Sequence, residues 1–160
     1  MLFRRRGWDK APAEPAGVLL ASAGTPFSGA AVRRACELAA GQPVAVLTIL
    51  KVYGSSFGLP NPGLLPTRRE RDEQYTIVRR AIAAVERRGG TADGQIAATR
   101  SAGRTIAKVA RRRRVRYVVM DDSAPTGVRR VTEGAVTATV RRRLGDAATL
   151  ELVGPGARIS

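Results

Sequence analysis

Short apolar runs alternate along this chain with longer segments whose apolar residues recur every three or four positions. The short runs predict buried strands at residues 17–22, 44–50, 95–99, 117–120 and 149–153. The longer segments predict amphipathic helices at residues 27–40, 68–88 and 132–144. A fourth helix is expected after Ser101 to Gly103, ending in the arginines at 111–114.

This alternation defines a fold class. Strands that are apolar at nearly every position need cover on both faces, as the strands of a parallel sheet have. Right-handed crossovers then predict an open, doubly wound α/β fold with a five-stranded parallel sheet and helices on both faces. The chain of 160 residues is the size of one domain, which we place at residues 17–154. We expect residues 1–16 to be a flexible basic N-terminal tail and residues 155–160 a C-terminal tail.

The residues between these segments give two local predictions. Thr67 precedes the strongest helical pattern and is expected to be its N-cap, and Gly89 is expected to end that helix. Residues 52–67 are rich in Gly and Pro and are expected to be an irregular loop. Two interpretations of its apolar side chains remain open, a lid or partner contact and packing back onto the core. These side chains are Phe57, Leu59, Leu64 and Leu65.

Residue types that are missing exclude many functions. The chain contains no histidine and one cysteine, Cys36, which excludes Ser-His-Asp and Cys-His catalysis, His-ligated zinc and an internal disulfide. We therefore expect a protein that is not an enzyme and holds no metal, with Cys36 as a small residue near the core. No apolar run approaches the roughly 18–20 residues of a membrane span, and the basic N-terminus lacks the apolar segment of a secretory signal. The expected location is the cytoplasm.

Charge adds a weaker prediction. The formal net charge is +15, and clustered cations bind phosphates by releasing their counterions. The arginines are scattered as doublets and triplets through several predicted helices, however, without a zinc finger, an RNA-recognition motif or an aromatic platform. We expect non-specific nucleic-acid binding at low salt and no dedicated nucleic-acid function.

The segment from Tyr117 to Leu144 carries the clearest candidate site. A buried strand is followed by a loop with two acids, a Pro and a Gly, and then by a helix. Helix N-termini after such loops attract anions because their first amides lack internal partners. The segment resembles the last nucleotide-binding motif of the universal stress protein family, Met-Gly-x2-Gly-x9-Gly-[Ser/Thr]. Met120 and Gly134 match this motif, whereas Asp121, Ala124 and Ala135 do not.

The resemblance extends over residues 17–154 and implies an open five-stranded α/β sheet, often dimeric through its final strand. Here that strand carries Glu151 where the family is apolar. Members that bind ATP usually have Asp-Gly-Ser after the first strand, whereas this chain has Ala23, Gly24 and Thr25. The resemblance therefore implies a degenerate ATP site, with departures at Ala23, Asp121, Ala124 and Ala135.

Two hypotheses follow from this pattern. In the first, the protein has lost ATP binding of the usual kind and acts through protein contacts as a homodimer. In the second, it senses a small ligand such as ATP, AMP or cyclic AMP through an altered site. An alternative to ligand binding is that arginines pair with Asp121 and Asp122 and close the loop. Arg100, Ser101, Gly103 and Arg104, at the end of the third strand, could also meet an anion. The residues of a retained nucleotide site would be Gly24, Thr25, Met120, Gly127, Arg129, Arg130, Gly134 and Ala135.

Overall fold

A parallel sheet of five strands forms the centre of the protein, as the sequence predicts. The computed structural model describes residues 14–52, 55–56, 59–60, 65–122 and 128–154, with only the backbone course at 55–56, 59–60 and 128–133. The strand order is β5-β2-β1-β6-β7, and all four neighbouring pairs are parallel. The strands are β1 (Val18–Ser22), β2 (Val44–Lys51), β5 (Ala92–Thr99), β6 (Tyr117–Asp121) and β7 (Thr149–Val153).

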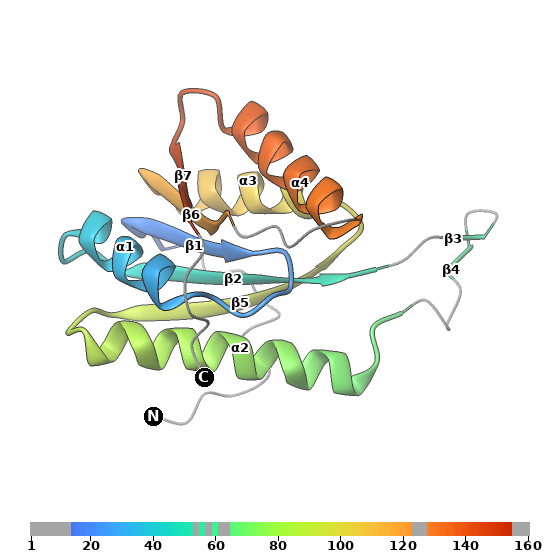
Figure 1. Ribbon diagram of the computed structural model, residues 1–160, viewed down its shortest axis with the longest axis horizontal. Coiled ribbons are helices and arrows are strands. Elements are labelled where there is room, and N and C mark those ends of the chain that lie inside the picture. The colour runs from blue at the N-terminus through green and yellow to red at the C-terminus, as the bar shows by residue number, and fades with distance from the viewer. Residues whose placement is uncertain (1–13, 53–54, 57–58, 61–64, 123–127, 155–160) are drawn as a thin grey trace.

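Within the described ranges, four helices cover the two faces of this sheet, as the arrangement in Figure 1 shows. Helices α1 (Gly29–Ala39) and α2 (Arg68–Arg87) pack on one face, and α3 (Ala102–Arg112) and α4 (Val128–Leu144) on the other. Alternate residues of β1 enter the two cores, Val18 and Leu20 toward α1 and α2, Leu19 and Ala21 toward α3 and α4. This double burial is why the strand appears in the sequence as an unbroken apolar run.

Two elements begin earlier than the sequence predicts. Strand β5 begins at Ala92 rather than at residue 95. Asp93 and Gly94 are residue types that are typical of turns, so the sequence pattern does not show that they lie within the strand. Gly94 lies against α2, where an added Cβ would be 2.3 Å from Val78 Cγ1. Helix α4 begins at Val128 rather than at residue 132.

The expectation of an irregular loop at 52–67 is wrong in part. Two short strands, β3 (Ser55–Ser56) and β4 (Leu59–Pro60), pair antiparallel there, at a distance from the main sheet (Figure 1). Leu65 is 51% exposed and so does not pack back onto the core. Phe57 and Leu64 lie outside the described residues, and so does the side chain of Leu59.

The predicted helix boundaries of α2 are confirmed. Thr67 is the N-cap and forms a capping box with Glu70, since its side chain accepts from the Glu70 amide while the Glu70 carboxylate accepts from the Thr67 amide. Gly89 follows the helix with a φ of +80°, the left-handed conformation that glycine adopts most readily. No helix among the described residues is both long enough and apolar enough to cross a membrane.

Candidate functional site

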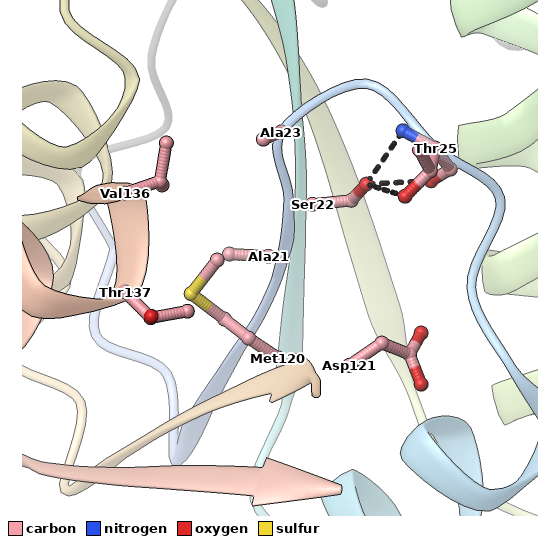
Figure 2. Close-up of a pocket in the computed structure, with 8 residues that line it drawn as sticks. All are labelled: Ala21, Ser22, Ala23, Thr25, Met120, Asp121, Val136 and Thr137. Atoms are coloured by element: carbon pink, nitrogen blue, oxygen red, sulfur yellow. Dashed lines mark hydrogen bonds between the residues drawn. The ribbon is translucent and has the colours of Figure 1, made fainter. Parts of the chain in front are cut away.

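The candidate site lies beside β1, from which the order of strands runs outward first to one side of the sheet and then to the other. Strand β1 pairs with β2 on one side and β6 on the other, so the carboxyl ends of β1 and β6 flank the switch point at which open α/β sheets bind ligands. A small pocket opens there (Figure 2). Its lining residues are Ala21, Ser22, Ala23, Thr25, Met120, Asp121, Val136 and Thr137.

The turn that leaves β1 is closed by the hydroxyl of Ser22. Ser22 Oγ accepts hydrogen bonds from the amides of Gly24 (3.2 Å) and Thr25 (2.9 Å) and donates to the Thr25 carbonyl (2.5 Å). Gln74 Nε2 from α2 donates to the Gly24 carbonyl at 3.0 Å. The two amides best placed to bind an anion at the end of β1 therefore already have a partner within the chain.

Glycine is required at the centre of this turn. Gly24 has a φ of +114°, and an added Cβ would lie 3.1 Å from the Ile49 carbonyl oxygen of the neighbouring strand. A residue with a side chain would be strained by both conditions. The glycine shared with the family motif therefore has a structural reason in this chain, independent of any ligand.

Asp121, at the end of β6, contacts the start of α1. Its carboxylate accepts hydrogen bonds from the Ser28 amide (2.9 Å) and from the Ser28 hydroxyl. Ser28 is the N-cap of α1, and its Oγ accepts from the Ala31 amide at 3.0 Å. A carboxylate at a helix N-terminus is stabilised by the partial positive charge of the unpaired amides. Figure 2 shows this carboxylate directed away from Val136 and Thr137.

What remains of the pocket is small and largely apolar on its α4 side. The Met120 side chain extends between Ala21 and Thr137 (Figure 2), and Thr137 Oγ1 donates to the Gly134 carbonyl at 3.0 Å. The cavity volume is about 30 Å³, on the order of the space of one water molecule. The described residues alone therefore leave little enclosed space at the switch point.

A second group of polar side chains is buried beside the turn. Ser22 and Thr48 are neighbours across β1 and β2, and Thr48 and Gln74 are almost completely buried. Among the described residues, Thr48 Oγ1 and Gln74 Oε1 have no hydrogen-bond partner. Buried acceptors of this kind are normally satisfied by a donor such as an ordered water.

The predicted site residues are only partly brought together. Gly24, Thr25 and Met120 meet at the switch point. Gly134 and Ala135 are exposed and lie inside α4 rather than at its N-terminus, so their amides are not among the first four, unpaired amides of the helix.

The other predicted residues cannot be placed in the site. Arg129 and Arg130 fall in the first turn of α4, and their side chains lie outside the described part, so an arginine pairing of Asp121 and Asp122 there stays a prediction. Gly127 lies outside the described residues.

Sequence reasoning missed four residues of this region: Ser22, which it placed only in a strand, Ser28, Gln74 and Thr48. Ser28 had a signal, since a serine directly before a helical apolar pattern is a typical N-cap. Gln74 and Thr48 had none, because a polar residue within an apolar pattern does not reveal its partner. In the described ranges no three His, Cys, Asp or Glu side chains lie close enough to hold a metal ion.

This sheet order and switch-point pocket define a doubly wound α/β protein, and a comparison with protein families identifies which kind. The model of the universal stress protein family matches residues 17–144. The chain belongs to this family. A search of curated proteins found no match.

Solved structures of universal stress proteins share the fold. One from Archaeoglobus fulgidus has a TM-score of 0.64 at 14% identity, covering 87% of this chain and 93% of that one. A structure from the same organism in complex with dAMP has a TM-score of 0.58 at 14% identity, covering 86% and 96%. A universal stress protein in complex with cAMP has a TM-score of 0.61 at 16% identity, covering 88% and 98%. At these identities the similarity establishes the fold alone.

Proposed function

We propose that this chain is a non-catalytic regulatory member of its family that does not bind ATP in the usual family manner and acts through protein contacts. The observation that carries the proposal is the contact between Asp121 and Ser28. An internal carboxylate occupies a position beside the switch point, where it would repel a triphosphate.

Two further features support the loss of ATP binding. The amides of Gly24 and Thr25 are satisfied by Ser22, and the pocket has a volume of about 30 Å³.

A non-catalytic role is supported by the residue types of the chain. The chain lacks a histidine, the usual general base at neutral pH. A fixed carboxylate that accepts two hydrogen bonds is a poor substitute for such a base.

The test is to measure nucleotide content and binding directly. The purified protein is denatured and its supernatant analysed for adenine nucleotides, and thermal melting is followed with Mg–ATP, AMP and cyclic AMP. We expect an empty protein and no ligand-induced rise in melting temperature. A variant carrying Ala23→Asp, Asp121→Gly, Ala124→Gly and Ala135→Ser is expected to gain such a rise. Co-purifying nucleotide in the natural chain would overturn the proposal.

A second candidate function is a sensor with an altered adenine-nucleotide site. It is favoured by the meeting of Gly24, Thr25 and Met120 at the switch point, and by related structures described as complexes with dAMP and cAMP. Any such binding should be abolished by Arg129→Gln together with Arg130→Gln. The control removes the same charge on α2, through Arg79→Gln and Arg80→Gln, and should leave binding unchanged.

The protein contacts that we propose include a homodimer through β7. This strand is an edge of the sheet, and edge strands pair readily unless charge blocks them. The charge of Glu151 is compensated by Arg34 of α1, whose Nε lies 3.4 Å from the carboxylate, and this contact raises the pKa of Arg34. Glu151 is thus a weaker barrier to pairing than its sequence position suggests.

The dimer can be tested at one backbone amide. Thr149 donates to the Arg116 carbonyl and the Val153 carbonyl accepts from Asp122, so the alternate amide of Leu152 points to the open side of the strand. Leu152→Pro removes that donor without removing one from the ladder with β6. We expect a dimer in sedimentation analysis that becomes monomeric in this variant. The control Glu151→Gln should remain dimeric.

A further inference from the structure

A second concave surface lies at the amino-terminal ends of the strands, opposite the switch-point pocket. It is formed between the C-terminal ends of α3 and α4. This groove has a volume of about 340 Å³, on the order of ten water molecules. It therefore has room for a phosphate group with its sugar. Its lining residues are Ala110, Arg111, Arg114, Val115, Leu144, Ala147 and Ala148.

Positive charge is concentrated around this groove. The segments 111–116 and 141–147 contribute seven exposed arginines and one acid, Asp146. Within the described ranges none of the seven forms an ion pair with an acidic side chain, in contrast to Arg34 and Arg69, which do. The charge here is therefore available to a partner. The seven are Arg111, Arg112, Arg114, Arg116, Arg141, Arg142 and Arg143.

The two helices bring these arginines together. Arg111 Nη2 donates to the carbonyls of Arg143 (2.5 Å) and Leu144 (3.4 Å), which joins the end of α3 to the end of α4. Thr139 packs against α3 at Gly103, where an added Cβ would be 2.7 Å away. Arg143 lies one turn beyond Thr139 on the same side of α4, beside the groove but outside its lining.

The turn at the end of α3 places Arg114 at the groove. Helix α3 ends in a Schellman turn, with the Val115 amide bonded to the Ala110 carbonyl and the Arg114 amide to the Arg111 carbonyl. Arg114 therefore adopts a φ of +51°, which favours glycine. Among the described residues, glycines with positive φ follow the other three helices, at Gly41, Gly89 and Gly145. Ala40, the C-cap of α1, shares the left-handed conformation with a φ of 48°, so the conformation shows that the turn does not require glycine and leaves the Arg114 side chain exposed beside the groove.

The chemistry of the groove favours one kind of partner. Its larger apolar residues, Val115 and Leu144, are buried, so no described side chain of the groove would insert into a lipid bilayer. Among the residues that the structure describes, no aromatic side chain lines it, so these residues offer no platform for stacking single-stranded bases. Arginine binds phosphate through a planar pair of donors. We propose that the groove between α3 and α4 binds the phosphate backbone of double-stranded DNA, without reading its sequence.

The test compares two variants of equal charge. Binding of a fluorescent DNA duplex of mixed sequence is measured by anisotropy at roughly 50 to 200 mM salt. The groove variant carries Arg111→Gln and Arg114→Gln in the groove lining and Arg143→Gln beside it. We expect its affinity to fall by about tenfold or more, and the slope of log K against log salt to become shallower by about 2 to 3.

The matched control removes three exposed arginines from α2, on the other side of the sheet (Figure 1). Arg79→Gln, Arg80→Gln and Arg87→Gln lower the net charge equally and should change the affinity by less than about threefold. Equal losses in both triple variants would show that total charge, and not the groove, governs binding, and would overturn the proposal.

A single substitution separates binding from folding. Arg114→Gly relieves the strained φ, so the melting temperature should rise by roughly 1–4 °C, while DNA affinity falls. Unchanged affinity in this variant would contradict the proposal, and so would tighter binding to single-stranded DNA than to duplex. Groove-dependent binding to anionic phosphatidylglycerol vesicles without duplex binding would assign the surface to a membrane instead.

Discussion

The buried guanidinium of Arg113 is held by groups that are far away in the sequence. Its side chain is 2% exposed, and it donates to both carboxylate oxygens of Asp93, at 2.7 and 2.6 Å, and to the Glu14 carbonyl at 2.5 Å. A charge at this depth is tolerated only when its donors are satisfied. The same contact fixes residues just before β1 to the end of α3.

Removing the carboxylate should therefore be costly. We predict that Asp93→Asn lowers the free energy of unfolding by about 3 kcal/mol, because it leaves the buried Arg113 charge uncompensated. Urea denaturation measures the loss. Adding Arg113→Met should recover much of it, since no charge then remains buried. Asp146→Asn, on an exposed acid, is the control and should change stability by less than about 0.5 kcal/mol.

Cys36 gives a prediction about pH. Burial raises the pKa of its thiol, and the nearby charge of Arg88 offsets part of this effect. Iodoacetamide alkylation of the native chain should thus reach its half-maximal rate at a higher pH than alkylation of the urea-unfolded chain. Because the folded pKa is the higher one, the contribution to stability is present at neutral pH and is lost as pH rises through the folded pKa.

The control for this prediction changes only the neighbouring charge. Arg88→Gln removes the positive charge beside Cys36, so the midpoint of alkylation should move to still higher pH. A native midpoint at or below that of the unfolded chain would show that burial does not protect the thiol.

At the scale of elements, the packing of α2 on β5 depends on the absence of one side chain. Gly94 lies beneath the helix, 2.3 Å from Val78 Cγ1 and 3.0 Å from Ile82 Cδ1 as measured from a hypothetical Cβ. The close approach lets Val78 and Ile82 become almost completely buried. A larger residue would have to displace the helix or its side chains.

We predict that Gly94→Ala destabilises the fold by about 2 kcal/mol through overpacking. Val78→Ala removes the atom in conflict, so the double variant should be more stable than the two single losses imply, by about 1 kcal/mol or more. Denaturation of the four chains in this cycle measures the coupling. Additive losses would mean that the sheet and helix adjust without strain.

The elements themselves could largely be predicted from the sequence. The apolar runs locate five parallel strands and Thr67 locates the start of α2, because burial on two faces and N-capping leave local patterns. The start of β5 could not be predicted, since Gly94 packs against α2 and Asp93 pairs with Arg113, and both contacts join segments that are distant in the sequence. Contacts between distant segments leave no periodicity.

The candidate site shows the same division. Its position after β6 could be predicted, because the strand, loop and helix of residues 117–144 leave a local pattern, whereas the strand order that brings β1 beside β6 is a result of the structure. The role of Asp121 could not be predicted, because its partner Ser28 lies 93 residues away. The sequence shows Asp121 as a departure from the family motif; in the fold it is also the acceptor that completes the N-terminus of α1.

At the scale of the whole molecule, charge is distributed unevenly. The formal net charge is +15. The seven exposed arginines near the ends of α3 and α4 lie at the amino-terminal ends of the strands, whereas the switch-point pocket lies at their carboxyl ends. Excess charge of one sign opposes the compact state through self-repulsion. Salt screens this repulsion over about 10 Å at 0.1 M.

We therefore predict that added sodium chloride raises the melting temperature. The dependence should be shallower in the chain with Arg79→Gln, Arg80→Gln and Arg87→Gln, because it has less repulsion to screen. Differential scanning calorimetry across a salt series measures both slopes. A melting temperature that falls with salt would mean that attractive ion pairs outweigh the repulsion.

The place of β1 at the centre of the sheet has a consequence for how the chain is made. Val18 pairs with Val44 on one side but with Tyr117 on the other. At a synthesis rate of roughly 5–20 residues per second, the second neighbour leaves the ribosome roughly 5–20 s after the first strand. During that interval one edge of β1 is open and can pair with another nascent chain. The growing polypeptide is therefore expected to depend on chaperones until its last third has been translated.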